Sequence, residues 1–210
     1  MVITLEMWPP RGRNCTGART VQASELTDEQ WHLIQDLFVE EETGGRPRIA
    51  PRPCLEGVLW ALRSGARWKD LPIHFPSYTT CWRRLAEWMD NGIFEEAWRR
   101  MLHKLDRKGR VDWSMADGRC DVCPGKKRGE CVSPTKRGKG SKLMLLIDGK
   151  GLPLGIDLHS ASPAEVRLIE PLLDNHILDQ HAPRLIYDRA ADSDPLRDRL
   201  AQDGIQLISP

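Results

Sequence analysis

The sequence predicts an α+β chain, with a helical N-terminal part followed by an α/β domain that contains a mixed sheet. Through the first half, apolar residues recur at the three- and four-residue spacing of helices. After Val111, short apolar runs separated by glycine and proline take over, which is typical of strands and turns. Two of these runs lead to an aspartate, Asp117 and Asp188. We therefore expect a helical domain over residues 25–108 and an α/β domain over residues 109–210.

Composition narrows the class of protein. The formal net charge of the 210 residues is +1, so any affinity for nucleic acid must come from local basic patches. No apolar run approaches the roughly 18 residues of a membrane span, and the N-terminus lacks a signal-peptide pattern. Six cysteines in a chain of this length do not form a disulfide scaffold, and Cys54 and Cys81 are expected in the core. We expect a protein of the reducing cytosol, with residues 1–24 as a disordered lead.

The first helix begins at a recognisable N-terminal signal. Thr27 and Gln30 form a T-x-x-Q capping box, and Leu26 and Trp31 are placed as a hydrophobic staple. The apolar face of this helix continues through Phe38, and the helix stops before a Gly-Gly pair. A Pro- and Arg-rich loop follows.

Three more helices are expected, over residues 54–64, 78–90 and 93–107. Each has an apolar stripe, and a glycine follows each of the first two. The helices over 54–64 and 78–90 resemble a helix-turn-helix, with Arg83 and Arg84 on the polar face of the second. A three-helix bundle with a solvated polar face is the alternative. The tryptophans of these helices are expected in the core rather than as base-stacking platforms; they are Trp60, Trp82, Trp88 and Trp98.

Two segments carry local positive charge. Residues 44–69 hold six basic residues against one acid, and residues 119–142 hold eight against two. The second segment is expected to be a loop facing a phosphate backbone. If six of its charges neutralise phosphates, the logarithm of affinity should fall with that of salt concentration at a slope of about −5. The candidate DNA-binding residues outside the helices are Arg46, Arg48, Lys126, Lys127, Arg128, Lys136, Arg137, Lys139 and Lys142.

The second half predicts strand, hairpin, helix, strand, helix and strand. The first strand is expected to end at Asp117, and a hairpin to run from Leu143 to Leu158 through a turn at Asp148. Ser162 and Glu165 suggest a capping box for a helix through about residue 173, which Pro171 would bend or end. The remaining elements are expected over residues 185–187, 195–202 and 205–208.

The two aspartates that follow apolar runs carry the chemical prediction. If Asp117 and Asp188 meet at one edge of the sheet, their carboxylates can hold Mg²⁺ or Mn²⁺, which prefer hard oxygen ligands. Two such ions would stabilise the attacking and leaving oxygens of a phosphoryl displacement. Either aspartate alone is more often a turn residue, but together, beside a basic segment, they favour a nuclease-like site.

These motifs in combination resemble bacterial insertion-sequence transposases of the insertion-sequence-five type. The motifs are LTDEQW at 26–31, GRPR at 45–48, WSMADG at 113–118, PTKRGKGSK at 134–142, DGKGLPLG at 148–155 and YDRAADSD at 187–194. The resemblance implies an RNase H-like domain with a DDE triad, whose first two acids are Asp117 and Asp188, and a helical part that binds transposon ends. Asp148 is then a turn residue, and Asp192 and Asp194 begin a helix. The implied partners are double-stranded DNA, as terminal inverted repeats and target, and other copies of the chain, at the bacterial nucleoid.

The third acid of the triad is the main departure. In this family it is a glutamate on a helix after the strand that here is Ile205–Ile208, and the sequence ends before such a helix. Glu165 and Glu170 lie on a different helix. The resemblance therefore implies an RNase H-like domain incomplete at its C-terminus and a truncated, catalytically defective transposase. A non-catalytic DNA-binding fragment that inhibits the full-length enzyme, and an inert pseudogene product, are the alternatives.

Three cysteines in the basic segment raise the question of zinc. Cys120 and Cys123 have the C-x-x-C spacing of zinc ligands, and Cys131 lies nearby. No histidine is close in sequence, and the family resemblance supplies no role for zinc. Structural zinc is the minor alternative here.

Overall fold

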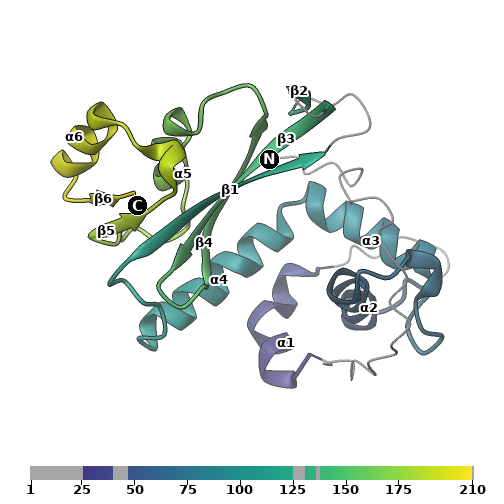
Figure 1. Cartoon of the computed structure of the whole chain (residues 1–210). Helices are drawn as coiled ribbons and strands as arrows, with labels where there is room; N and C mark the ends of the chain where they lie inside the picture. Colours follow the sequence, from purple (N-terminus) through teal and green to yellow (C-terminus); the bar gives the residue numbers. More distant parts are fainter. Residues whose placement is uncertain (1–25, 40–46, 125–130, 136–137, 210) are drawn as a thin grey trace. The chain divides into compact units, whose positions relative to one another are not determined.

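The structure is a computed structural model that describes residues 26–39, 47–124, 131–135 and 138–209 (Figure 1). These residues belong to two compact units, one that extends to Met101 and one that begins at Leu102. Of the helices in the described part of the chain, none combines the length and hydrophobicity that a membrane crossing needs.

In the described residues of the N-terminal unit, all secondary-structure elements are helices. Its elements are α1 (Asp28–Ile34), η1 (Gln35–Leu37), α2 (Pro51–Ser64), η2 (Trp68–Asp70), α3 (Tyr78–Asp90) and α4 (Ile93–Arg107), the last of which continues into the second unit. The predicted capping box is confirmed, because the Thr27 hydroxyl accepts from the Gln30 backbone and the Gln30 side chain accepts from Thr27 N–H at 2.9 Å. The helix that follows is shorter than predicted, and its last turn is a 3₁₀ helix.

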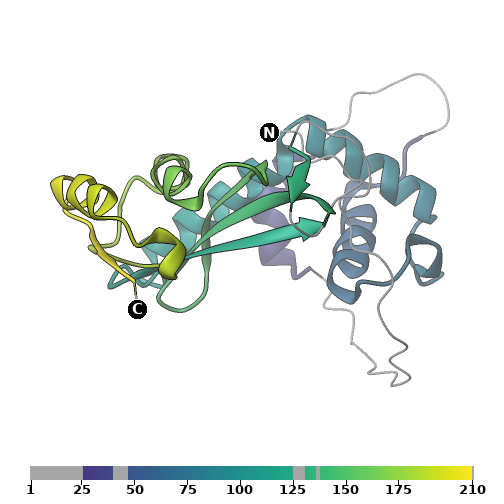
Figure 2. The same cartoon turned by 45° about the horizontal axis from the view of Figure 1, so that its top comes forward.

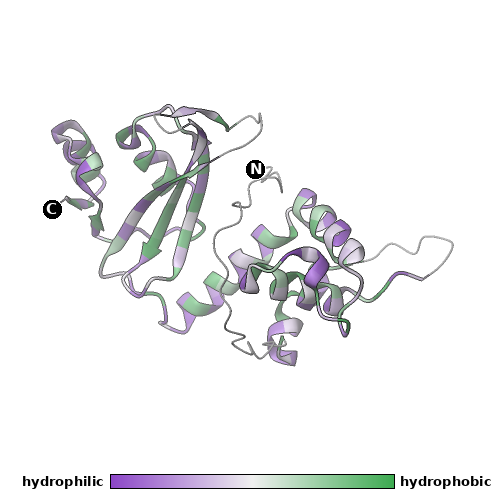
Figure 3. Ribbon diagram, turned by 45° about the vertical axis from the view of Figure 1, so that its right-hand side comes forward, coloured by the Kyte–Doolittle hydropathy of each residue, from purple (hydrophilic) through white to green (hydrophobic). Residues whose placement is uncertain are grey.

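The core of this unit lies between α2 and α3. Cys54 and Cys81 are fully buried in it, as predicted. The ring of Trp88 meets that of Phe38 edge-on, with centroids 4.8 Å apart. Trp88 is buried in this core, as predicted. Trp60, Trp82 and Trp98 are only partly buried, so the core prediction is confirmed for Trp88 alone. The hydrophobic and hydrophilic residues of α2 and α3 alternate along each ribbon (Figure 3), as expected for helices with one buried face.

The C-terminal unit is built on a six-stranded mixed sheet. Its strands are β1 (Ala116–Pro124), β2 (Ser133–Thr135), β3 (Gly138–Asp148), β4 (Pro153–Ser160), β5 (Arg184–Ile186) and β6 (Gln206–Ile208). The central β1 pairs antiparallel with β3 on one side and parallel with β5 on the other. β4 pairs with β3, and β6 pairs parallel with β5.

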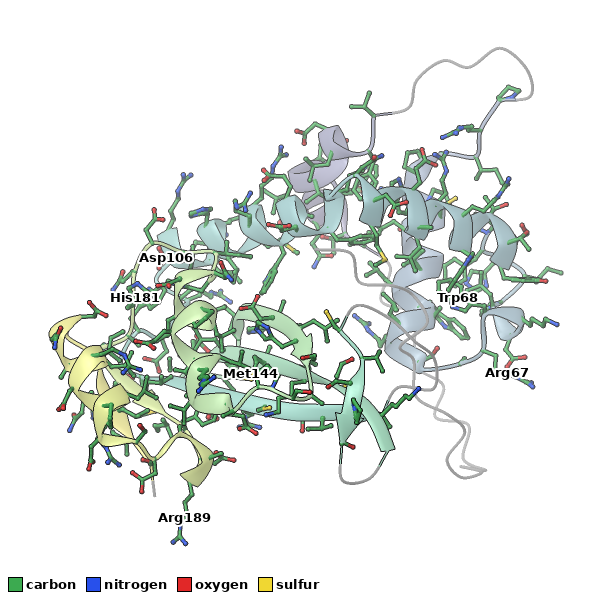
Figure 4. The ribbon with its side chains drawn as sticks, turned by 90° about the horizontal axis from the view of Figure 1, so that it is seen from above. Arg67, Trp68, Asp106, Met144, His181 and Arg189 are labelled. Atoms are coloured by element: carbon green, nitrogen blue, oxygen red, sulfur yellow. The ribbon has the colours of Figure 1, made fainter. Side chains whose placement is uncertain are left out.

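Short helices cover one face of this sheet. They are η3 (Glu165–Arg167), α5 (Ile169–Asp174), η4 (Arg189–Ala191) and α6 (Asp194–Gln202). Figure 2 shows α5 beside the β3–β4 hairpin and α6 beside β6, in agreement with the contacts of these elements. On the covered face, Met144 of β3 is fully buried (Figure 4), and Gly155 of β4 lies against α5 and His176.

The first strand differs from the prediction. It was expected to end at Asp117 and to give way to a loop, but β1 begins at Ala116 and runs to Pro124. Burial alternates only as far as Asp121, with Arg119 and Asp121 exposed and Cys120 half-buried, and Val122 is exposed as well, so burial alone does not explain the longer strand. β3 pairs with β1 along its whole length and supplies the backbone hydrogen bonds that a loop would lack.

The helix after the hairpin also differs from the prediction. It is split into η3 and α5, and the predicted capping box does not form, because Ala164 occupies the cap position without a side-chain hydrogen bond. Pro171 does not end α5 but lies in its first turn, where a missing N–H costs nothing. The turn role of Asp148 is confirmed: its carboxylate accepts from the backbones of Asp112, Lys150 and Leu152 at 2.9, 2.9 and 2.7 Å.

Candidate functional site

Asp117 lies in the second position of the central strand. Its Cα partners are Ile147 on antiparallel β3 and Ile186 on parallel β5. Paired residues of neighbouring strands project to the same face of a sheet, so Asp117 shares a face with these two isoleucines. The Asp117 side chain is 30% exposed, and solvent can therefore reach its carboxylate.

Asp188 approaches the same face from β5. It follows Ile186 by two residues, and its own backbone is extended, with φ −72° and ψ 178°. The intervening Tyr187 packs against Gly118 on the opposite face. Because side chains alternate along an extended backbone, Asp188 projects to the face of Asp117. This register agrees with the expected convergence of the two acids, whose catalytic role stays a prediction.

The two aspartates are close in the lattice of the sheet. Asp188 is one strand across and two residues along from Asp117, which corresponds to about 8 Å between Cα atoms. Asp188 is exposed, and one of its carboxylate oxygens accepts from the Ala190 backbone N–H at 2.8 Å. Arg189 follows it and points away from the sheet (Figure 4). The pair thus forms an acidic position that is open to solvent.

Arg119 neutralises one of these acids. Its Nε and Nη2 both donate to Asp117 Oδ2, at 3.0 and 2.8 Å. Residues two apart on a strand project to the same face, and this spacing brings the guanidinium onto the carboxylate. The sequence prediction counted Arg119 only as part of the basic segment. The pairing could have been found from the two-residue spacing if the strand had been extended beyond Asp117.

The other face of β1 carries a separate polar group under η3. Lys142 donates to the Pro163 carbonyl at 2.6 Å and lies 3.7 Å from the Glu165 carboxylate. Burial, together with the nearby Glu165, raises the pKa of the Cys120 thiol to about 12. The same two causes raise the pKa of the Tyr187 hydroxyl well above its usual range. Glu165 is thus engaged on the face opposite Asp117.

Glu170 is engaged elsewhere too. Its carboxylate oxygens accept from Arg199 of α6 at 2.7 and 3.0 Å. Asp192 and Asp194 both pair with Arg197, and Asp194 is the first residue of α6. Among the described residues, no group of three or more His, Cys, Asp or Glu side chains is arranged to hold a metal ion.

The cysteines of the basic segment do not converge. Cys120 is level with Met144 of β3, and Cys123 is level with Ser141. These positions are three apart on one strand, so the two thiols project to opposite faces. Cys131 donates to the Leu158 carbonyl at 3.6 Å. This geometry disfavours a shared zinc ion on Cys120 and Cys123.

Two of the predicted DNA-binding residues are buried in the structure. Arg84 is 6% exposed and donates to the Ile49 carbonyl at 3.2 Å. Lys142 is 9% exposed and pairs inside the domain. Burial and internal partners disfavour a phosphate contact for either residue.

The other predicted DNA-binding residues are either exposed or outside the described residues. Arg83 and Lys139 are exposed. Arg48 is also exposed, and it pairs with Glu87 at 3.0 Å. The remaining six lie outside the described residues; they are Arg46, Lys126, Lys127, Arg128, Lys136 and Arg137.

Comparison with protein families decides the identity. A family model for the transposase DDE domain matches residues 89–210, which is more than half of the chain. The chain belongs to the DDE transposases. A second model, for a transposase of the IS4/5 family, matches residues 26–98. The family predicted from the sequence motifs is therefore confirmed. The structure also confirms the α+β fold class, with helices followed by a domain that contains a mixed sheet.

Two bacterial relatives of this DDE transposase are similar in sequence. An uncharacterized 16.2 kDa protein of insertion element IS402 from Burkholderia cepacia is 36% identical over 98 residues, which cover 43% of this chain and 67% of the relative. The uncharacterized protein y4sN from Sinorhizobium fredii is 38% identical over 94 residues, covering 44% of this chain and 71% of that protein.

Solved transposase structures share a distant likeness. The piggyBac transposase synaptic complex with hairpin DNA has a TM-score of 0.49 at 13% identity, over 88% of this chain and 48% of that one. The Mos1 transposase paired-end complex with left transposon end has a TM-score of 0.32 at 14% identity, over 80% and 61%. This chain thus spans about half of the piggyBac chain.

Proposed function

We propose that this transposase binds the ends of a bacterial insertion sequence and that Asp117 and Asp188 are two acids of its phosphoryl-transfer site, which would cleave DNA and transfer strands. The observation that carries the proposal is the strand register that directs both side chains to one face. Glu165 lies on the opposite face, and Glu170 is paired with Arg199.

The donor set fits a divalent cation. Asp117 and Asp188 offer carboxylate oxygens, the hard ligands that Mg²⁺ and Mn²⁺ prefer, and both are open to solvent. A guanidinium already lies on Asp117, so the position attracts positive charge. When bound, the metal would supply charge stabilisation for a phosphoryl displacement. The chain's own part is to hold the two carboxylates on rigid neighbouring strands, where their separation is fixed before DNA arrives.

Exposed basic residues would hold the DNA. Arg83 on α3 and Lys139 on β3 are exposed, and cations in such positions neutralise phosphates. The double-stranded partners would be the terminal inverted repeats of the element and the target DNA, which places the protein at the nucleoid. Homo-oligomers are expected by family resemblance.

The acids of the described residues favour a second candidate. Asp117 and Asp188 are two of the three acids that the family resemblance implies, and Glu165 and Glu170 are engaged elsewhere. The second candidate is therefore a chain that binds DNA without cleaving it. In that case it would act as a DNA-binding chain that occupies element ends and inhibits the full-length enzyme. Loss of one metal ligand of three should reduce the cleavage rate by orders of magnitude.

Metal binding and end cleavage together test the proposal. Mn²⁺ binding should be weakened by Asp117→Asn and by Asp188→Asn, but not by Asp198→Asn, which changes an exposed carboxylate on α6. Equal Mn²⁺ binding by all four proteins would refute the site. Duplex DNA carrying the element's ends should be bound by each variant. Rapid Mg²⁺-dependent cleavage of that DNA by this chain would refute the defect while supporting the acids.

A further inference from the structure

The ion pair of Asp117 with Arg119 occupies the position where a metal would bind. Both donor atoms of Arg119 converge on a single oxygen, Asp117 Oδ2, at 2.8 and 3.0 Å. The Asp117 side chain is 30% exposed and the Arg119 side chain is 63% exposed. The contact is therefore a surface ion pair that can open without disturbing the core.

The strand register also places Arg119 next to the second acid. Asp117 is level with Ile186 of β5. Two residues further along each strand are Arg119 and Asp188, which puts these two positions at the same level on the same face. Arg119 thus lies beside both candidate metal ligands: it is two residues from Asp117 on β1 and level with Asp188 on the neighbouring strand.

We propose that Arg119 is the resident counter-ion of Asp117, and that a divalent cation must displace its guanidinium in order to bind Asp117 Oδ2. This inference rests on the proposed function, in which Asp117 is a metal ligand. Arg119 is then a positioning residue that sets the affinity of the site for metal, without itself touching the reacting phosphate.

Competition follows from the chemistry of the two cations. A guanidinium and a divalent ion use the same oxygen lone pairs, so both cannot occupy Oδ2 at full strength. The arginine stays protonated at every working pH and therefore always competes. In the absence of metal it leaves Asp117 with a partner, and in the presence of metal it swings toward solvent with its charge retained. The exchange raises the metal concentration needed to fill the site.

The effect on metal affinity should be modest and specific. Exposed ion pairs contribute little, and their loss corresponds to about a two- to five-fold change in a binding constant. We therefore expect Arg119→Gln to lower the dissociation constant for Mn²⁺ by about that factor. Arg119→Lys keeps the charge but loses the two-donor contact, and its affinity should lie between those of Arg119→Gln and the unchanged protein.

The experiment is a Mn²⁺ titration of the full 210-residue chain, in which free Mn²⁺ is followed by electron paramagnetic resonance. The control is Arg199→Gln, which removes the same charge from another exposed arginine–carboxylate pair in this unit, Arg199 with Glu170. It should leave Mn²⁺ affinity unchanged. The double variant Arg119→Gln/Asp117→Asn should show no gain over Asp117→Asn alone, because the carboxylate through which Arg119 acts is absent.

The outcomes separate this inference from the proposed function. If Asp117→Asn binds Mn²⁺ as well as the unchanged protein, the metal site itself is wrong and the inference falls with it. If Asp117→Asn loses binding while Arg119→Gln binds no more tightly than the unchanged protein, only the role of Arg119 is refuted. An equal gain in Arg199→Gln would mean that net charge, rather than displacement, controls the affinity, which also refutes it. Circular dichroism and thermal unfolding confirm that each variant is folded.

Discussion

The ring of Tyr187 lies directly against the α-carbon of Gly118. A Cβ atom on Gly118 would come within 2.5 Å of Tyr187 Cδ2, closer than real Cβ contacts allow. Tyr187 is 2% exposed and stands between Ile186, the last residue of β5, and Asp188. Because position 118 has no side chain, the Tyr187 ring can pack directly on β1. This packing places Asp188, the next residue, on the other face of the sheet.

Gly118→Ala should destabilise the C-terminal unit. The added methyl has to push the ring away, and overpacking of this kind costs about 1–3 kcal/mol of unfolding free energy. Urea unfolding measures it. In a Tyr187→Leu background the ring is absent, so the penalty of the same substitution should shrink. An equal penalty in both backgrounds would show that Gly118 matters for a reason other than Tyr187.

Lys139 and Lys142 have the same side chain on the same strand but different surroundings. Lys142→Met removes the partner of the Pro163 carbonyl and leaves Glu165 without its nearby cation, so unfolding free energy should fall by about 1–3 kcal/mol. Lys139→Met should change stability by less than about 0.5 kcal/mol. DNA affinity should respond in the opposite order, measured as binding against salt concentration. Equal stability losses in the two variants would contradict the burial of Lys142.

Arg83 and Arg84 make the same distinction in the N-terminal unit. Arg83→Ala should reduce the slope of log affinity against log salt by about 0.9, as expected for one lost phosphate contact. Arg84→Ala should leave that slope unchanged and lower stability by about 1–3 kcal/mol, because it leaves the Ile49 carbonyl without its donor. Fluorescence anisotropy with labelled duplex DNA measures the first effect, and urea unfolding the second. A salt slope that changes only in Arg84→Ala would reverse the assignment.

Local signals predicted much of the fold. The α3 and α4 ranges match the predicted 78–90 and 93–107, because each helix has a full apolar stripe and a clear stop. The Thr27 capping box and the turn contacts of Asp148 with Lys150 and Leu152 were predictable for the same reason, since these partners are within four residues. The contact of Asp148 with Asp112, 36 residues away, was not. The Ser162 capping box failed because the chain is extended at Ala164 and the helix begins later.

Non-local features were harder to predict. The extension of β1 to Pro124 depends on pairing with β3, which the charged residues of the segment obscured. Likewise, a charge count cannot separate Arg83 from Arg84 or Lys139 from Lys142, since the face of an element decides which cation reaches solvent. From the sequence, Asp117 and Asp188 could be placed at the ends of two strands, but whether their side chains share a face of the sheet could not be decided. The register between β1 and β5 supplies the physical reason for the shared face.

The pair of Glu170 and Arg199 predicts a defined pH dependence. It joins α5 to α6, and the hydrogen bond from the Arg199 guanidinium lowers the pKa of the Glu170 carboxyl below its ordinary value. A carboxyl whose pKa is lower in the folded state stabilises that state above its unfolded pKa, and the contribution is lost as pH falls through the folded pKa. Because both side chains are partly exposed, the contribution should be about 0.2–1 kcal/mol. Glu170→Gln should therefore lower unfolding free energy by that amount at pH 6–7, and the difference from the unchanged protein should disappear toward pH 2. Asp198→Asn on α6 is the matched control and should show no such convergence, whereas a constant difference for Glu170→Gln down to pH 2 would assign the effect to packing rather than charge.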